Sequence, residues 1–231
     1  MFGIIFTFSM VIALSFFQGS GDASAKTSCQ NHQFLNIVSL SGDHPADVCE
    51  ASQKAIEFLA RYDLHLKRPV TIELVETSIN NRGYIAFGSY DRSQDKIRLM
   101  SYEAIMAGTA PQMYDQPFDM EHYHGAIAHE IAHAVFQHNT AGIEDQLTNA
   151  TQEYLAHATQ LGVLSPQRRR QIIEASEVGP WESGDSVSEI YMSLNPSGFA
   201  VKSYLHLSKL DNPQPFIAIL LRNNWFYLSV P

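Results

Sequence analysis

Between residues 33 and 101 the apolar positions come in short runs that are separated by turn residues. In the run from Pro69 to Val75, apolar and polar residues alternate with a period of two, which is typical of a strand with one buried face. Residues 46–62 instead carry apolar residues near helical spacing and predict a helix. The pattern predicts strands at residues 33–40, 70–75, 84–88 and 96–101, with the last at an exposed edge of a sheet.

From about residue 119 onward the apolar positions follow a helical period. Ser165 followed by Pro166 is typical of a helix start, because the serine caps a backbone N–H and the proline lacks one that would have no partner. Helices are predicted over residues 119–138 and 147–162, from Ser165, and near residues 187–193, 199–208 and 214–222. Strands followed by helices predict an α+β fold with a small mixed sheet.

The first 25 residues have the pattern of a secretory signal peptide, in which an apolar run precedes the small residues that end at Ala25. The run is shorter and less uniform than a membrane-spanning helix, so a retained anchor is the less favoured alternative. Cleavage leaves residues 26–231, which we expect to form one domain with a sheet-containing lobe (26–140) and a helical lobe (141–231). We therefore expect a secreted or periplasmic protein without stable membrane insertion after cleavage.

The amino-acid composition argues against one class of binding partner. With 15 Lys and Arg against 24 Asp and Glu, the chain has a formal net charge of −9, which argues against nucleic acid because nucleic-acid binding needs a basic face. Cys29 and Cys49 are the only cysteines. In an exported chain they predict a disulfide, and two cysteines are too few for a thiolate zinc finger.

The helix predicted at residues 119–138 carries the sequence His129-Glu130-Ile131-Ala132-His133. Two histidines four residues apart lie one turn apart on one helix face, so both imidazoles can reach one ion, while Glu130 lies about 100° round the axis. Zn²⁺ on neutral imidazoles lowers the pKa of water to about 7, and Glu130 could take the proton of that water and pass it to a leaving amine. The alternative is a structural histidine-rich helix that binds no metal.

A catalytic zinc site has three protein ligands and one open position, so a third ligand is needed. The first helix extends about 7.5 Å beyond His133, and six residues of the next helix return about 9 Å, which brings Glu153 back to the level of the ion. Glu153 is therefore the predicted third ligand, and Glu144, Asp145 and His157 are the substitutes.

With the histidine pair and the segment Glu153-Tyr154-Leu155-Ala156-His157, the chain resembles a zincin metallopeptidase of the gluzincin type over about residues 33–162. It is also similar in outline to small secreted bacterial proteins that carry this motif. The resemblance implies that His129, His133 and Glu153 bind Zn²⁺ and that Glu130 is the general base and acid. It further implies a zincin-like fold, in which an antiparallel edge strand precedes the active-site helix and an extended peptide substrate lies along that strand.

The chain departs from the gluzincin pattern in its second shell. Many gluzincins place an aspartate four residues after the glutamate ligand to orient a zinc histidine, and His157 stands there in this chain. His157, Asp119 or Glu121 could serve that purpose. The substrate-anchoring signature of the aminopeptidase branch does not occur in the sequence, so we expect an endopeptidase.

Peptide hydrolysis also needs a donor that stabilises the oxyanion, and Tyr204 and His206 are the candidates, with Tyr191 behind them. The leading prediction is zinc-dependent peptide-bond hydrolysis on a peptide or protein substrate. The alternative is a secreted zincin-fold binding protein without catalytic turnover.

Overall fold

The computed structural model describes residues 25–29, 32–39, 44–81, 84–140, 147–182, 185 and 187–222. Within this part, one mixed sheet has five strands in the order β1-β2-β3-β7-β6. These are β1 (Ala25–Ser28), β2 (Leu35–Ser39), β3 (Val70–Val75), β7 (Lys96–Met100) and β6 (Gly88–Asp91). The three central strands β2, β3 and β7 are parallel, and β1 and β6 are antiparallel to their neighbours at the two edges.

The prediction that residues 96–101 form an edge strand is wrong. This segment, β7, pairs with β3 on one side and β6 on the other, so it lies inside the sheet. The segment predicted as one strand at residues 84–88 divides at Phe87: β5 (Tyr84–Ala86) pairs with β4 (Ile79–Asn81), and β6 turns back along β7. The antiparallel edge strand beside β7 is therefore β6.

A short helix and a hairpin connect the sheet to the central helix. These are α2 (Tyr102–Met106), β8 (Gln112–Met113) and β9 (Gln116–Pro117). The two residues between β8 and β9, Tyr114 and Asp115, have φ values of 54° and 58°. Two successive residues in the left-handed region are typical of a tight two-residue hairpin turn.

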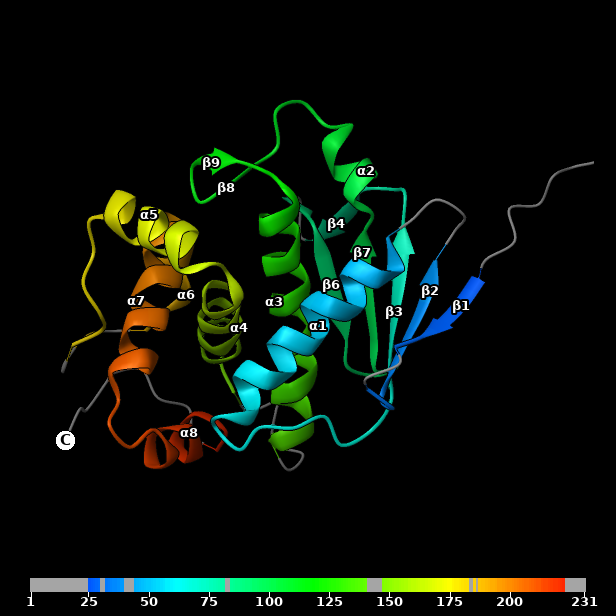
Figure 1. The fold of residues 1–231 in the computed structure, drawn as a ribbon. Helices are drawn as coiled ribbons and strands as arrows, with labels where there is room; N and C mark the ends of the chain where they lie inside the picture. The colour runs from blue at the N-terminus through cyan, green and yellow to red at the C-terminus, as the bar shows by residue number, and fades with distance from the viewer. Residues whose placement is uncertain are drawn as a thin grey trace, which may run out of the picture.

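The helices are α1 (Pro45–Ala60), α3 (Met120–Asn139), α4 (Asn149–Val163), α5 (Pro166–Ser176), α6 (Glu189–Leu194), α7 (Pro196–Lys209) and α8 (Gln214–Leu220). Polar side chains cap α3 and α5: Asp119 accepts from the backbone N–H of His122, and Ser165 accepts from that of Arg168, which confirms the predicted helix start at Ser165. Figure 1 shows the sheet on one side, α5 to α8 on the other, and α3 between them.

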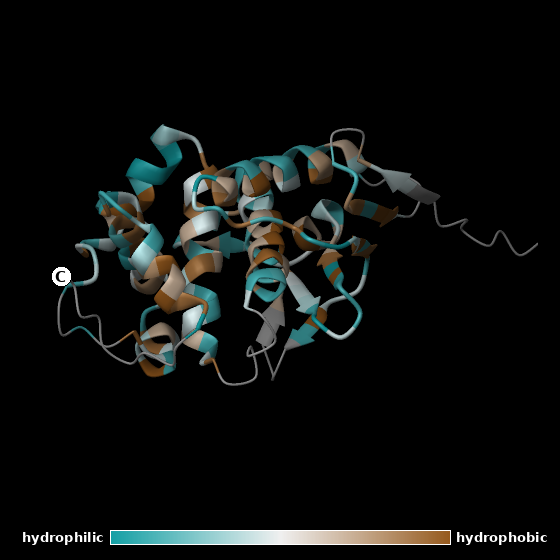
Figure 2. Cartoon of the chain, turned by 90° about the horizontal axis from the view of Figure 1, so that it is seen from below, coloured by the Kyte–Doolittle hydropathy of each residue, from teal (hydrophilic) through white to brown (hydrophobic). Residues whose placement is uncertain are grey.

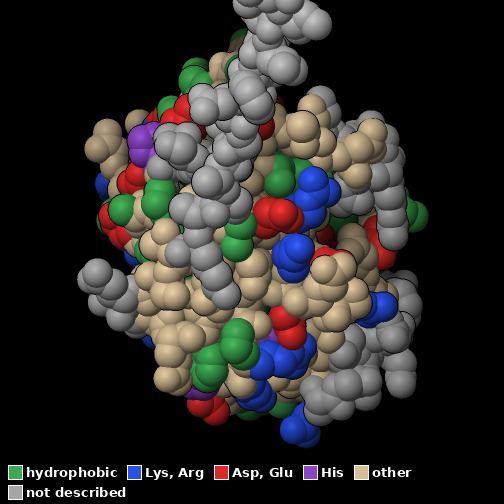
Figure 3. All heavy atoms as spheres, turned by 90° about the vertical axis from the view of Figure 1, so that its right-hand side faces the viewer, with side chains coloured by type: hydrophobic (Ala, Val, Ile, Leu, Met, Phe, Trp, Pro, Cys, Tyr) green, Lys and Arg blue, Asp and Glu red, His purple; other side chains and the backbone are tan. Residues whose placement is uncertain are grey.

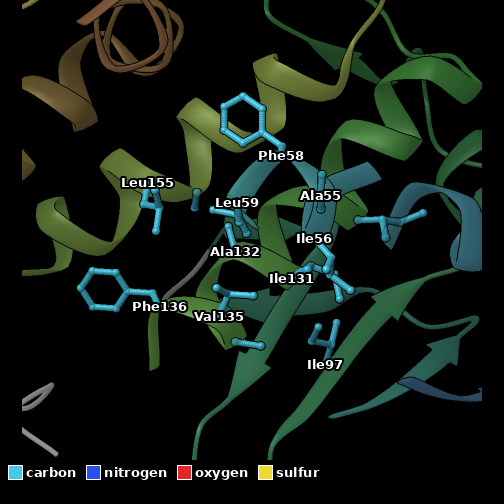
Figure 4. Close-up of a cluster of buried hydrophobic side chains, with 14 of the residues drawn as sticks. Ala55, Ile56, Phe58, Leu59, Ile97, Ile131, Ala132, Val135, Phe136 and Leu155 are labelled. Atoms are coloured by element: carbon cyan, nitrogen blue, oxygen red, sulfur yellow. The ribbon is translucent and has the colours of Figure 1, made fainter. Parts of the chain in front are cut away.

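The main core lies where α3 meets α1, α4 and the sheet. Figure 4 shows Ile131 and Val135 of α3 close to Ile97 of β7, and Phe136 of α3 near Leu155 of α4. All five side chains are almost fully buried. Brown and teal residues alternate along the helices and strands in Figure 2, as expected of elements that each bury one face. The fold is thus α+β, and its central helix α3 is buried on nearly every side.

The outer face of the sheet is polar. Glu73 of β3 lies 3.8 Å from the ammonium group of Lys96 and 3.9 Å from the guanidinium of Arg98, both on β7. Figure 3 shows acidic and basic side chains mixed on this side of the molecule.

Asp95, in the turn between β6 and β7, joins the sheet to the end of α3. Its carboxylate accepts hydrogen bonds from Arg68, from the Tyr90 hydroxyl (2.6 Å) and from His138 Nε2 (2.9 Å). His138 Nδ1 accepts from the backbone N–H of Lys67 at 3.2 Å, which leaves the proton on Nε2 and the imidazole neutral. His138 is thus a structural residue that holds the C-terminal end of α3.

A disulfide joins Cys29, after β1, to Cys49 in α1, which confirms the predicted pairing. The predicted signal peptide falls on residues 1–24, which lie outside the described residues, and on Ala25. In the described part of the chain, every helix is too short or too polar to cross a membrane.

Candidate metal and acid–base site

Two histidines of α3 face away from the apolar core. His129 and His133 lie one turn apart, with ring centroids 4.8 Å apart and their Nε2 atoms 3.1 Å apart. Their side chains are 16% and 14% exposed. The neighbouring apolar residues fix the rotation of α3, so the histidine pair must point toward α4.

Helix α4 brings a carboxylate to this pair. Glu153 Oε2 lies 3.2 Å from His129 Nε2, and Glu153 Oε1 lies 3.6 Å from His133 Nε2. One turn further along α4, His157 Nε2 lies 3.8 Å from the same Oε2 atom. The structure therefore brings together all three predicted ligands and adds His157, whereas Glu144 and Asp145 lie outside the described residues.

Gln160 contacts two histidines of the site at the ring nitrogens that do not face Glu153, and the sequence analysis did not predict this residue. Its amide oxygen lies 3.1 Å from His129 Nδ1 and 3.2 Å from His157 Nδ1, and its amide nitrogen donates to Met113 Sδ at 3.0 Å. The sequence feature that could have identified Gln160 is its position three residues after His157, on the same face of α4.

The carboxylates that we predicted for this orienting role are used elsewhere. Asp119 caps α3 and pairs with Arg168, and Glu121 accepts the backbone N–H of Ser165 at 2.6 Å. Asp119 is the N-cap of α3 and Glu121 lies in its first turn, both two turns or more before His129, so neither side chain lies at the histidine pair.

Burial and charge set the protonation of the cluster. Burial lowers the pKa of His133 to about 4 and that of His157 to about 3. Burial alone would raise the pKa of Glu153, but the nearby imidazoles lower it below its usual range. Burial likewise acts to lower the pKa of His129, and the hydrogen bond and charge of Glu153 raise it on balance. The ionised carboxylate of Glu153 and the neutral imidazoles of His133 and His157 have the protonation states that metal ligands require.

Glu130 lies beside this cluster in a different environment. Its side chain is 7% exposed and packs against Gly88 of β6, where an added Cβ atom would lie 2.6 Å from Glu130 Cγ. Burial raises the pKa of Glu130 to about 7, and the charge of Glu153 acts in the same direction. A carboxyl group with such a pKa can both accept and donate a proton near neutral pH.

The cluster opens into a cavity of about 840 Å³. The cavity is lined by the face of α3 that carries His129 and His133, the face of α4 that carries Glu153 and His157, the edge strand β6 and the β8–β9 hairpin. Tyr114, at the hairpin turn, lines this cavity, and its buried hydroxyl has no hydrogen-bond partner among the described residues. Burial, and then the charge of Glu153, raise the pKa of the Tyr114 phenol, so the hydroxyl keeps its proton and is a donor.

The structure does not bring the predicted oxyanion donors to this cavity. His206 is buried on α7 and its Nδ1 lies 2.7 Å from the Tyr154 hydroxyl. Tyr204 packs under the Arg169 guanidinium, 5.1 Å from the ring centroid, and Tyr191 packs against a tryptophan ring. Tyr154 directly follows Glu153 and points to a different side of α4, where its hydroxyl meets His206. The part of α7 that lines the cavity is its first residues, Pro196 and Ser197, which precede His206 by more than two turns.

The donor set fits a divalent transition metal. One ligand atom from each of His129, Glu153 and His157 lies within 4.8 Å of the others, and His133 Nε2 faces the same carboxylate. Imidazole nitrogens with a carboxylate oxygen are ligands typical of zinc. The Nε2 atoms of His129, His133 and His157 lie 3.2 Å, 3.6 Å and 3.8 Å from the Glu153 carboxylate oxygens, so one small volume is bordered by all four groups.

The model of one protein family, described as "Family of unknown function (DUF6639)", matches residues 36–229, a span that includes every residue of this site. No curated protein and no solved structure matches the chain.

Proposed function

The chain belongs to the DUF6639 family, and we propose that it is an exported zinc-dependent endopeptidase. His129, His133 and Glu153 would hold the ion, and Glu130 would act as general base and acid. The observation that carries the proposal is the approach of the Glu153 carboxylate to both histidines, at 3.2 Å and 3.6 Å, beside a buried glutamate that belongs to neither contact.

The sheet supports a zincin-like fold of the gluzincin type. The antiparallel edge strand β6 lines the same cavity as the histidine face of α3. An extended peptide can pair with such an edge through main-chain hydrogen bonds, and the side chains that alternate along the peptide then enter the cavity. The substrate class that fits is thus a peptide or an extended segment of a protein.

A bound Zn²⁺ ion supplies a Lewis acid that polarises the scissile carbonyl and lowers the pKa of water to about 7. Glu130 accepts a proton from the attacking water as the new C–O bond forms at the carbonyl carbon. Glu130 then donates that proton to the amine nitrogen as the C–N bond breaks. The contact with Gly88 holds Glu130 in place during both transfers.

Tyr114 takes the role for which Tyr204 and His206 were the sequence candidates. Its protonated hydroxyl lines the cavity and has no partner in the part of the chain that the structure describes, so it is available to donate a hydrogen bond to the oxygen that gains negative charge. A preorganised donor of this kind is typically worth 10²–10³-fold in kcat.

A second candidate function is a zincin-fold binding protein without turnover. His157 favours it, because its Nε2 atom lies 3.8 Å from Glu153 Oε2 and four protein ligands would close a zinc site. Glu130 disfavours it, since a binding module has no use for a buried base next to the ion.

The test combines zinc content with peptide hydrolysis. We expect about one zinc per chain by elemental analysis, hydrolysis of internally quenched peptides that a chelator abolishes, and loss of zinc in Glu153→Ala. Glu130→Gln should keep its zinc and lose hydrolysis. Glu121→Gln is the matched control on the same helix, because its amide oxygen still accepts from Ser165 and it lies outside the cavity.

Two other outcomes would contradict the proposed function. Zinc binding without hydrolysis of any peptide would overturn the enzyme and favour the binding protein. A parent protein that takes up no zinc when supplied with it would overturn both.

A further inference from the structure

We propose that His157 is a fourth protein ligand of the metal ion, and that Gln160 is a positioning residue that prepares His129 and His157 together for metal binding. This inference rests on the proposed zinc site and extends it. A three-ligand site needs only His129, His133 and Glu153, so His157 and Gln160 have no part in the function proposed above.

The first argument is the position of His157. It lies one turn after Glu153 on the same face of α4, and its ring centroid is 4.7 Å from that of His129. Its Nε2 atom lies 3.8 Å from Glu153 Oε2, and its side chain is 16% exposed, as is that of His129. The His157 imidazole therefore borders the same small volume as the three proposed ligands.

The second argument is the hydrogen-bond direction at Gln160. A carbonyl oxygen can only accept, so the contacts of Gln160 Oε1 at 3.1 Å and 3.2 Å require a proton on Nδ1 of both His129 and His157. The neutral ring then has its lone pair on Nε2. In both histidines Nε2 is the nitrogen that faces Glu153.

A hydrogen-bond network without metal would need the opposite amide orientation. The amide NH₂ group would then donate to both Nδ1 atoms, and both Nε2–H groups would donate to Glu153. That orientation would turn the amide oxygen toward Met113 Sδ, which has no proton to donate. The observed orientation lets the amide nitrogen donate to the sulfur and the amide oxygen accept from both rings.

The close packing of α3 on α4 keeps Gln160 in this position. A Cβ atom at Gly125 of α3 would lie 3.3 Å from Gln160 Cγ, so the glycine lets the glutamine side chain lie against α3 beneath His129. Gln160 is itself only 4% exposed. A buried acceptor shared by two ligand rings fixes two ring orientations at once.

A four-ligand set fills the tetrahedral positions that zinc prefers, so peptide hydrolysis would then require a fifth coordination position on the cavity side. The four-ligand set also predicts that zinc binds more tightly than it would to three of these ligands.

The experiment measures zinc affinity by competition with a chromophoric chelator and the number of histidine ligands by X-ray absorption. We expect three histidines in the parent and two in His157→Ala, with zinc affinity lower by at least tenfold in the variant. His65→Ala is the control for loss of a histidine, because His65 is 54% exposed and lies outside the cavity, and it should leave both values unchanged. Circular dichroism of each variant verifies that it folds.

A second pair of variants tests Gln160 without removing a ligand. Gln160→Leu removes the acceptor and should lower zinc affinity by about 10–100-fold. Gln160→Glu keeps an acceptor for both Nδ1–H groups and should retain or raise the affinity. If Gln160→Glu lost zinc as Gln160→Leu does, the tautomer argument would be overturned.

The outcomes separate this inference from the proposed function. A parent with two histidine ligands, and unchanged zinc affinity in His157→Ala, would overturn the fourth ligand and leave the three-ligand peptidase intact. A parent without zinc would overturn both.

Discussion

The contact between Gly88 and Glu130 makes a prediction whose size follows from the structure. In Gly88→Ala, the new Cβ atom would lie 2.6 Å from Glu130 Cγ and 2.9 Å from both Cδ and Oε1. Ordinary contact begins near 3.4 Å, so the Glu130 side chain must move by nearly 1 Å. Gly88 lies in the extended backbone of β6, which alanine also adopts, so the main effect of the substitution is this displacement.

A displacement of about 1 Å in a catalytic group can cost about 10²-fold in rate, which is about 2.7 kcal/mol in the activation barrier. The three nearest atoms to the new Cβ all belong to Glu130. We therefore expect Gly88→Ala to keep its zinc and to lose about 10²-fold in kcat/KM for peptide hydrolysis.

The assay compares zinc per chain, melting temperature and hydrolysis rate in the parent and two glycine variants. Gly179→Ala is the matched control, because a Cβ atom there meets no atom of the described residues within 4 Å. Full activity in Gly88→Ala would refute the role of Glu130 as a positioned base. Loss of zinc in Gly88→Ala would refute the reasoning in another way, by showing that the strain reaches the ligands.

Three further predictions follow from contacts already described. Tyr114→Phe should keep its zinc and lower kcat by 10²–10³-fold with little change in KM, measured by steady-state hydrolysis; an unchanged kcat would remove Tyr114 from the mechanism. Burial alone would raise the pKa of Asp95, but its hydrogen-bonded neighbours lower it from 3.8 to about 2, so the unfolded state binds more protons. The free energy of unfolding should therefore fall by about 1–2 kcal/mol as the pH drops from about 4 to about 2, and urea titrations of Asp95→Asn should not show this fall. Replacing both Cys29 and Cys49, which are 20 residues apart, by serine should lower the free energy of unfolding by about 3 kcal/mol in urea, and a loss below about 1 kcal/mol would contradict a stabilising cross-link.

Local physics was enough to predict most elements. The period-two run at residues 70–75 became β3 with the predicted bounds, and Ser165 caps the helix that begins at Pro166. Helical geometry alone also brought Glu153 to the level of the histidine pair, because the rise per residue fixes how far the chain travels out and back. These features depend on residues that are close together in the sequence, so the sequence alone is enough to predict them.

The sequence could not decide which strand lies at the sheet edge. The alternation in β7 looks the same whether one or both of its sides are paired, and the pairing depends on how the chain turns at Phe87 and Asp91. The same turn carries Gly88 to Glu130, which is 42 residues away in the sequence.

The sequence by itself therefore determined the residue types of the site and the helix faces that carry them: two histidines and Glu130 on one helix, and a glutamate on the next. Only the tertiary structure decided which residues surround these side chains. Tyr114 reaches the cavity through the β8–β9 hairpin turn, and Gln160 reaches His129 through the packing of α4 on α3, and no local pattern specifies either contact. Side-chain periodicity fixes directions within one element, whereas contacts between distant elements are fixed by how the whole core packs.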